Sequence, residues 1–355
     1  MICHDPIELN PINHKVKVVK KILLLGLGRV GKVFTHLATD FSITVFDMQP
    51  PPASLASLAS LGVTALEKTS LAALTPADLS PFDLVVNFLP VACNEQILPL
   101  VAETNCGYLD LATNEVDVPE QVAYRPYFSN RLFLANAGIA PGLDNLLVAR
   151  LIKKGAKDIR LYLIEHVFSH DTGLSWCAED AMATLNDRPI SSIAGQIREH
   201  DNFSDPEQVS TSQGDFVVYR FFGEEILSLG QTFKTANISL KAGGNEIETA
   251  RQIFMSGSNQ AILEATSEPD GIFGIKIVTE VGAAELFLKS SAQLWQAGLP
   301  GNYISFHTAY VAYTMLTTAL KHNLQGFYFP ETLPDLVQAE ILQKIKRQAT
   351  VWDID

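Results

Sequence analysis

A glycine-rich stretch, GLGRVG at residues 26–31, does most to limit the folds open to this chain. It follows the apolar run ILLL and opens RVGKVFTHLATD, whose apolar residues recur at helical spacing. In this context the first glycine permits a tight turn, and the second lets the backbone approach a pyrophosphate at the helix N-terminus. The third permits close packing of the helix on the strand. We therefore expect a dinucleotide-binding turn formed by Gly26, Gly28, Arg29, Val30 and Gly31.

Short apolar runs and helical stretches continue to alternate as far as residue 141. The runs at 43–46, 83–90, 107–111 and 131–135 are strand-like. The bare apolar run DLVVNFLP suits a central strand that is buried on both faces. Strands and helices in turn predict an α/β fold with a Rossmann-type, doubly wound parallel sheet.

The pattern changes after the helix that begins near Leu143. The segments 158–167, 215–222 and 273–282 are strand-like and are separated by polar loops, which indicates a second, α+β domain with a half-exposed sheet. Helical candidates follow at 303–323 and 330–349. We expect an N-terminal arm at 1–20, a dinucleotide-binding domain at 21–141, a substrate and dimerisation domain at 142–302 and C-terminal helices at 303–355.

Composition excludes several classes of function. A formal net charge of -13 repels phosphate backbones and anionic lipid, so we expect neither nucleic acid nor a membrane surface as a partner. The four cysteines are scattered, without CxxC or zinc-ligand spacing, which predicts reduced thiols, a cytoplasmic location and no metal site. No apolar run is long enough to cross a membrane, and residues 1–20 lack a signal-peptide core.

Polar residues end several strands at the carboxyl edge, where doubly wound sheets bind their ligands. Asp47 ends the second strand, near the spacing of the acid that binds a ribose 2′-hydroxyl. A carboxylate there repels a 2′-phosphate, so NAD is favoured over NADP, although a solvated acid at a strand end is the alternative. Asn87 and Pro90 end the next strand, and we expect them near the nicotinamide ribose.

The segment GYLDLATNE at 107–115 brings further acids to this edge. A carboxyl group in a cleft over a nicotinamide is a credible general acid or base, and we assign this role to Asp110 and Glu115. Capping of the next segment is the alternative for Asp110. No Tyr is followed four residues later by Lys, and neither GxxxxGK[ST] nor HExxH occurs. Carbonyl reduction by a Tyr–Lys pair is therefore disfavoured.

The stretch ANAGIAPGLDN at 135–145 joins the last strand of the first domain to a helix. Pro141 suits the start of that helix and Asp144 complements its dipole. Because the stretch lies at the carboxyl edge and before the change of pattern, we expect it to be both domain crossover and floor of the cleft. Gly138 is expected to leave room for the cofactor and Gly142 for the substrate.

Several of these segments, in this order, resemble the saccharopine dehydrogenase-like family, which includes saccharopine reductases and lysine 6-dehydrogenases. The resemblance covers most of the chain. It depends on the glycine turn, on GYLDLATNE, on AGIAPGLDNLLVARLI at 137–152, on SLKAGGNEIETARQIFMSG at 239–257 and on TAYVAYTMLTTALKHNLQGFYFPE at 308–331.

The resemblance implies a nicotinamide-dependent oxidoreductase that acts at a C–N bond of an amino acid or an amino-acid adduct such as lysine or saccharopine. It also implies C-terminal helices that return to the cofactor domain, and we expect a homodimer. Where the family has the Arg and His of "lRypGH", this chain has Lys241 and Asn245. We assign both to substrate binding, although Lys offers a carboxylate only a point charge and a surface lysine is the alternative.

Two further residues complete the candidate site. His166 follows the strand LYLIE and could shuttle protons, and by strand alternation it faces opposite to Glu165. Arg220 could be a second carboxylate anchor. A surface or packing role is the alternative for His166 and for Arg220.

Two other functions fit the same features. The departures at Lys241 and Asn245 also suit a dehydrogenase of a polyamine-type adduct, which lacks the carboxylate that an Arg would bind. With the unexpected Cys177, they also suit a nicotinamide-binding protein without catalysis.

Overall fold

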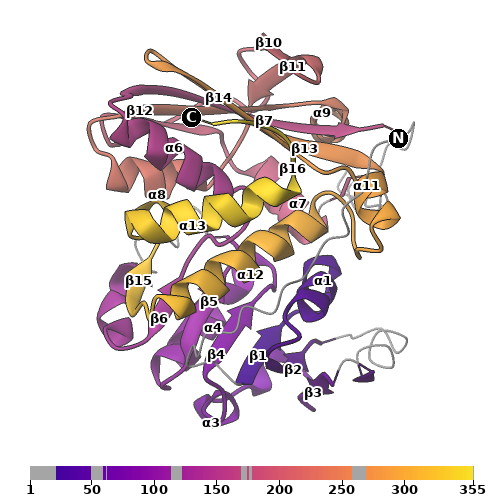
Figure 1. Ribbon diagram of the computed structural model, residues 1–355, viewed down its shortest axis with the longest axis vertical. Coiled ribbons are helices and arrows are strands. Elements are labelled where there is room, and N and C mark those ends of the chain that lie inside the picture. Colours follow the sequence, from indigo (N-terminus) through magenta and orange to yellow (C-terminus); the bar gives the residue numbers. More distant parts are fainter. Residues whose placement is uncertain are drawn as a thin grey trace, which may run out of the picture.

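The computed structural model describes residues 21–48, 59–60, 62–112, 122–168, 174–175, 178–257 and 269–354. Two sheets form two domains, and helices fill the layer between them (Figure 1). The predicted arm at 1–20 and most of SLASLASLG at 54–62 lie outside the described residues.

The first sheet has seven parallel strands in the order β15-β6-β5-β4-β1-β2-β3. The order reverses at β1, which is the switch point where such sheets bind dinucleotides. This confirms the predicted doubly wound sheet. Its strands are β1 (Lys21–Leu25), β2 (Ser42–Phe46), β3 (Thr64–Ala65), β4 (Leu84–Asn87), β5 (Gly107–Asp110), β6 (Leu132–Leu134) and β15 (Gly326–Tyr328).

Helices α1 (Arg29–Leu37), α3 (Pro76–Leu79) and α4 (Asn94–Ala102) follow strands of the first sheet. The burial pattern of β4 is continuous because both of its faces are covered. Helix α12 (Ser305–Lys321) returns from the far end of the chain to pack on α1, where Phe34 meets Tyr313 edge to face. The C-terminal part of the chain is thus built into the first domain.

The second sheet has nine strands and is mixed, since β12 and β7 are parallel and the other pairs are antiparallel. Its strands are β7 (Asp158–Val167), β8 (Ile190–Ile193), β9 (Gln196–Glu199), β10 (Glu207–Thr211), β11 (Gly214–Arg220), β12 (Asn237–Gly243), β13 (Gly271–Thr279), β14 (Gly282–Leu288) and β16 (Ala349–Asp353). After the C-terminal helices the chain reaches the second domain, because β16 pairs with β14.

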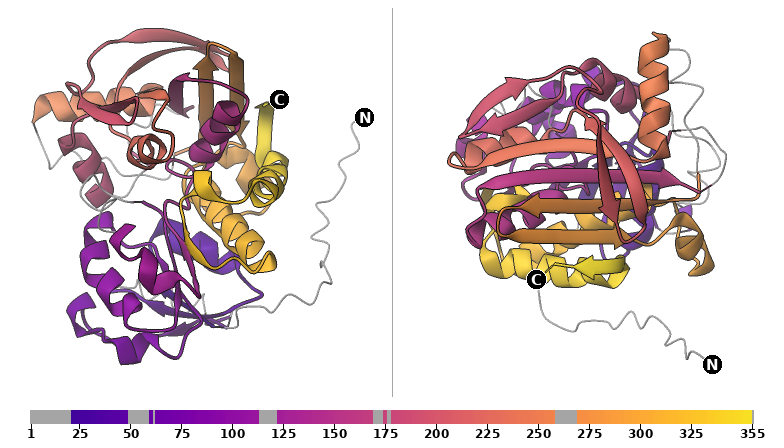
Figure 2. Two further views of the ribbon diagram at one scale, coloured as in Figure 1. Left: turned by 90° about the vertical axis from the view of Figure 1, so that its left-hand side faces the viewer. Right: turned by 90° about the horizontal axis from the view of Figure 1, so that it is seen from above.

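The second sheet has an inner face, which packs toward the first domain, and an outer face. Leu161 and Leu163 of β7 and Phe273 of β13 belong to the inner face and join the main core, which extends into the first domain. Tyr162 and Ile164 of β7 lie on the outer face, in a separate cluster with Phe216 and Val218. Seen from above, the strands lie across the top of the molecule with the first domain behind them (Figure 2).

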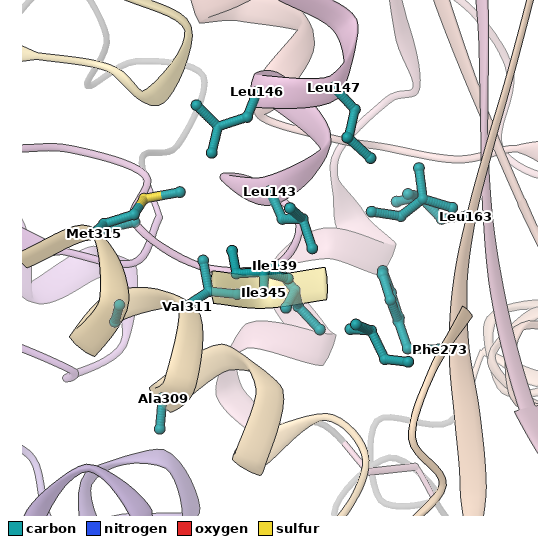
Figure 3. Close-up of a cluster of buried hydrophobic side chains, with 14 of the residues drawn as sticks. Ile139, Leu143, Leu146, Leu147, Leu163, Phe273, Ala309, Val311, Met315 and Ile345 are labelled. Carbon is teal, nitrogen blue, oxygen red and sulfur yellow. The ribbon is translucent and has the colours of Figure 1, made fainter. Parts of the chain in front are cut away.

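The main core ties the two domains into one body. Ile139 and Leu143 at the crossover lie between Leu163 of the second sheet and Val311 of α12 (Figure 3). The layer between the sheets is formed by α6 (Leu143–Lys153), α8 (Glu225–Thr232), α12 and α13 (Asp335–Ile345), while α7 (Ala178–Asn186), α9 (Asn245–Ser256) and α11 (Ser291–Gln296) belong to the second domain.

Candidate functional site

The three glycines of the turn differ in what a side chain would meet at each of them. Gly26 has φ +91°, and a Cβ there would lie 2.8 Å from the carbonyl oxygen of Phe88. A Cβ at Gly31 would lie 2.2 Å from the carbonyl oxygen of Gly26, so both positions need glycine for packing. At Gly28, the residue before α1, a Cβ would meet no atom of the described residues within 4 Å. Gly28 therefore leaves the helix N-terminus open to a phosphate.

Asp47 lies beside the same turn. Its carboxylate accepts a hydrogen bond of 2.6 Å from the backbone N–H of Leu27, between the first two glycines. The strand end thereby carries a negative charge where the ribose of a dinucleotide binds in this fold.

Asn87, at the end of β4, is 2% exposed and anchors a polar network. Its amide nitrogen donates to Oδ1 of Asn94 at 2.7 Å and to the hydroxyl of Tyr108 at 2.9 Å. Its Oδ1 accepts from the backbone N–H of Leu89, which shapes the loop that leads to Pro90. This network positions the chain between β4 and α4 at the carboxyl edge.

Asp110, at the end of β5, is 1% exposed and orients the crossover. Its Oδ1 accepts a hydrogen bond of 3.0 Å from the backbone N–H of Asn136, and its carbonyl accepts from Ala137. Asn136 has φ +57°, a conformation that non-glycine residues seldom adopt. These bonds give Asp110 a structural contact with the crossover rather than with the segment that follows it, and its role as acid or base stays a prediction. Glu115, the other predicted acid, lies outside the described residues.

The expected room at the crossover glycines is filled by the chain's own backbone. A Cβ at Gly142 would lie 2.0 Å from the carbonyl oxygen of Gly138, and Gly142 has φ +139°. A Cβ at Gly138 would lie 3.0 Å from the carbonyl oxygen of Pro141. The turn folds tightly on itself and needs glycine for its own packing, and the interpretation of these glycines as space for cofactor and substrate stays a prediction.

Three predicted site residues lie on the outer face of the second sheet, and this corrects their placement. His166 shares the face of Tyr162 and Ile164, and its ring packs 5.4 Å from that of Phe216. Burial lowers the pKa of His166. Lys241 pairs with Glu207 at 2.9 Å and with Asp205 at 3.0 Å.

Arg220 also pairs with Asp205, at 3.2 Å. Because side chains alternate along a strand, the inner face of β7 is taken by odd-numbered residues, including Glu165. His166, Lys241 and Arg220 therefore point away from the carboxyl edge of the first sheet.

Asn245, the first residue of α9, has a different task from the predicted one. Its Oδ1 accepts from the N–H of Val167 at 2.6 Å and its Nδ2 donates to the carbonyl of Val167 at 2.7 Å. The amide pairs with the end of β7 as a neighbouring strand would. These bonds fasten α9 to the second sheet.

A cluster of three buried carboxyl groups below the crossover was missed by the sequence analysis. Asp144 of α6, Glu225 of α8 and Glu331 of the short turn Pro330–Thr332 (η4) are at most 3% exposed. Burial, together with the charge of Glu225, raises the pKa of Asp144 well above its usual range. Burial raises the pKa of Glu225 and of Glu331 to about 7.

Asn145 holds this carboxyl cluster together. Its Nδ2 donates to Glu331 at 3.0 Å and to the hydroxyl of Ser228 at 3.1 Å, while its Oδ1 accepts from the N–H of Gly142. The only sequence signal was the acid in each of the family-like segments PGLDN and PE. The cluster joins elements that are distant in the sequence.

Asn136 is another residue that the sequence analysis missed. Its side chain is fully buried, and neither Oδ1 nor Nδ2 has a hydrogen-bond partner among the residues that the structure describes. It lies just after β6, at the carboxyl edge of the first sheet. An amide in this position has the groups to bind a polar ligand. The sequence feature that could have indicated Asn136 is its place at a strand end, two residues before Gly138.

The carboxyl edge thus gathers the glycine turn, Asp47, Asn87, Asp110 and Asn136 from different strands of the first sheet. Among the described residues, no group of three or more His, Cys, Asp or Glu side chains could hold a metal ion. Within the same part of the chain, no helix has both the length and the apolar character needed to cross a membrane.

Comparisons with known proteins agree with this geometry. Residues 22–132 match the family model described as the saccharopine dehydrogenase NADP-binding domain. No curated protein matches the chain. The apo saccharopine dehydrogenase (L-Glu forming) of Saccharomyces cerevisiae has a similar fold, with a TM-score of 0.66 over 92% of this chain and 97% of that chain, at 13% identity.

Weaker structural matches include two other dehydrogenases. The aspartate dehydrogenase of Thermotoga maritima is 14% identical, with a TM-score of 0.41 over 84% of this chain and 96% of that chain. The DAP dehydrogenase of C. glutamicum, in complex with DAP, is 11% identical, with a TM-score of 0.46 over 90% of this chain and 95% of that chain.

Proposed function

Because the chain carries a cofactor domain of the saccharopine dehydrogenase-like family, we propose that it transfers hydride between a nicotinamide and a carbon that bears nitrogen. The substrate we propose is an amino acid or an amino-acid adduct of the lysine or saccharopine type. The family match and the fold support an NAD(P)-dependent oxidoreductase, and the choice of substrate is the proposal. The observation that carries the proposed use of a nicotinamide cofactor is the open helix N-terminus at Gly28 beside the carboxylate of Asp47.

The residues present fit a dinucleotide. Gly28 and the N-terminus of α1 would hold the pyrophosphate, and Asp47 would hold the adenosine ribose. Asn87 would order the loop around the nicotinamide ribose, and the amide of Asn136 matches the hydrogen-bonding groups of the nicotinamide carboxamide. When bound, the cofactor supplies the hydride chemistry. The chain's own residues would orient the reactants, and Asp110 or Glu115 would handle protons.

We propose NAD as the preferred cofactor because of Asp47, although the matching family model is described as NADP-binding. A carboxylate at this position repels the 2′-phosphate of NADP and accepts hydrogen bonds from the 2′-hydroxyl of NAD. Titrating the wild type and Asp47→Ser with NADH and NADPH tests this choice. We expect the wild type to bind NADH more tightly and the variant to lose that preference.

The test of the reaction is turnover with lysine and with saccharopine, followed as NADH or NADPH formation. The reverse reaction is tested with amine and 2-oxo acid. Cofactor binding without turnover across this panel would contradict the proposed reaction and would favour a binding protein without catalysis.

The ion pairs of Lys241 support a second candidate, oxidation of a polyamine-type adduct. Lys241 is engaged by Asp205 and Glu207 on the outer face, so it does not offer its charge to a substrate carboxylate at the carboxyl edge. A carboxylate-free adduct needs no such anchor. If the Lys241→Ala variant turns over an amino acid as fast as the wild type, Lys241 does not bind the substrate. Preference for a polyamine adduct over lysine would favour the second candidate.

We also propose a cytoplasmic homodimer, as the composition and the family resemblance suggested. Light scattering after gel filtration measures the mass of the assembly. A monomer of about the chain mass of 38.8 kDa would contradict the dimer.

A further inference from the structure

A chain of polar contacts links the glycine turn to the second domain. Nη1 of Arg29, the first residue of α1, donates to the carbonyl of Ser175 at 3.0 Å. The Ser175 hydroxyl donates to the carboxylate of Glu246 at 2.8 Å, and the Ser175 N–H donates to the same oxygen. The hydroxyl of Tyr303 donates to the other oxygen of Glu246. We call these four residues the interdomain link.

Three of the four residues of the interdomain link are buried, Arg29 is half-buried, and the link joins parts of the chain that are far apart. Ser175 is 3% exposed, Glu246 is 1% exposed and Tyr303 is fully buried. Glu246 is the second residue of α9 in the second domain, and Tyr303 precedes α12, which packs on α1. Three elements therefore meet where α1 begins.

The charges within the interdomain link depend on each other. Burial raises the pKa of Glu246, while the hydrogen bonds from Tyr303 and Ser175 and the charge of Arg29 act in the opposite direction. A cation at a helix N-terminus is disfavoured by the helix dipole, so Arg29 needs negative groups nearby. The Ser175 carbonyl and the Glu246 carboxylate provide them.

We propose that Arg29 and Glu246 are positioning residues that couple occupancy of the cofactor site to the placement of the second domain. This inference rests on the proposed function. Arg29 belongs to the turn that would hold the pyrophosphate, and its guanidinium contacts Ser175 in the domain that would hold the substrate. Loss of the interdomain link at its Glu246 end should therefore weaken cofactor binding, although Glu246 lies outside the cofactor domain.

The test is a double-mutant cycle on cofactor affinity. NADH and NADPH are titrated by calorimetry into the wild type, Arg29→Met, Glu246→Gln and the double variant. The matched control is Glu248→Gln, two residues further along α9, which loses an ion pair with Arg251 instead. We expect Glu246→Gln to raise Kd at least about fivefold, the lower end for coupled sites, and Glu248→Gln to leave it unchanged.

The double variant distinguishes coupling from independent damage. If the interdomain link acts as a unit, the double variant binds no more weakly than Arg29→Met alone. If the increases in Kd of the two single variants multiply in the double variant, the inference is overturned and the proposed function stays intact. Equal Kd values for Glu246→Gln and Glu248→Gln would have the same consequence. A wild type that binds neither dinucleotide would overturn both.

A milder variant keeps the test decisive if Glu246→Gln does not fold. Ser175→Ala removes one hydroxyl from the carboxylate and preserves the carbonyl that Arg29 contacts. We expect a smaller rise in Kd and, in steady-state assays, a higher cofactor KM with little change in kcat. An unchanged Kd in a folded Ser175→Ala variant would then refute the coupling.

Discussion

The buried carboxyl group of Glu331 provides a quantitative test of how this fold holds charge between its two domains. The perturbation is Glu331→Gln, which keeps the shape and removes the ionisable proton. In the folded protein Glu331 is 3% exposed and accepts from Asn145. Burial raises its pKa from 4.5 to about 7, although hydrogen bonds from Ser228 and Asn145 act in the opposite direction.

The sign and size of the effect follow from proton binding. Between pH 4.5 and 7 the folded protein retains the proton of Glu331 and the unfolded chain has lost it, so the free energy of unfolding falls as pH rises. At about 1.4 kcal/mol per pKa unit, the gap between 4.5 and about 7 corresponds to about 3 kcal/mol. This stability is present below pH 4.5 and is lost above pH 7. Glutamine does not titrate, so the Glu331→Gln variant does not lose this stability as pH rises.

The assay is urea unfolding followed by circular dichroism at pH 5, 6, 7 and 8. We expect Glu331→Gln to be close to the wild type at pH 5 and more stable by up to about 3 kcal/mol at pH 8. The same difference in stability at pH 5 and pH 8 would refute the reasoning.

Glu340→Gln is the control for this experiment. Burial alone would raise the pKa of Glu340, but hydrogen bonds from His322, Lys321 and Lys344 lower it to about 2. Glu340 therefore stabilises the fold above its unfolded pKa, and this contribution is lost only as pH falls toward 2. Its replacement should destabilise the protein at pH 8, where the ion pairs with Lys321 and Lys344 remain, whereas Glu331→Gln should stabilise it at that pH.

Four further variants test the site and the core. Gly28→Ala should keep the melting temperature and weaken NADH binding, because a Cβ there meets open space at the helix N-terminus. Gly31→Ala should destabilise the fold by about 1–3 kcal/mol, because its Cβ would lie 2.2 Å from a carbonyl oxygen. Equal melting temperatures of the two variants would contradict this difference. Gly142→Val should prevent folding to a soluble protein, since its Cβ would lie 2.0 Å from a carbonyl oxygen, and a soluble variant with a cooperative melt would disprove the tight turn. Burial lowers the pKa of His307 to about 4, so the contribution of His307 to stability falls as pH drops from 6.5 toward 4. In thermal melts, the melting temperature of His307→Gln should fall less over that range than that of the wild type. The same dependence of melting temperature on pH in both proteins would argue against a neutral buried imidazole.

Much of the fold was predictable because its longer elements carry strong local patterns. The strand predicted at 158–167 has those bounds in the structure, and the helix predicted at 303–323 spans Ser305–Lys321. The hairpin of β8 and β9 and the strands β10, β12, β14, β15 and β16 were not predicted. Most of these strands have at most five residues, and β9 is exposed along its whole length, so little apolar period marks them.

The candidate site was predictable only where the chemistry is local. The glycine turn and Asp47 belong to one βαβ unit, and their hydrogen bond spans twenty positions in the sequence. His166 and Lys241 belong to β7 and β12, whose two faces are both largely buried, and Arg220 ends the neighbouring strand β11. Alternation predicts that neighbours point to opposite sides, but which side faces the first domain depends on how the two sheets pack.

The sequence by itself determined the doubly wound sheet, the dinucleotide turn and the crossover, because backbone geometry and hydrophobic period are properties of short segments. The tertiary structure alone decided which acids are buried together and which face of the second sheet is turned inward. It also decided that Arg29 reaches Glu246 through Ser175. These contacts join residues from separate elements, and they form only when the core packs the two domains against each other.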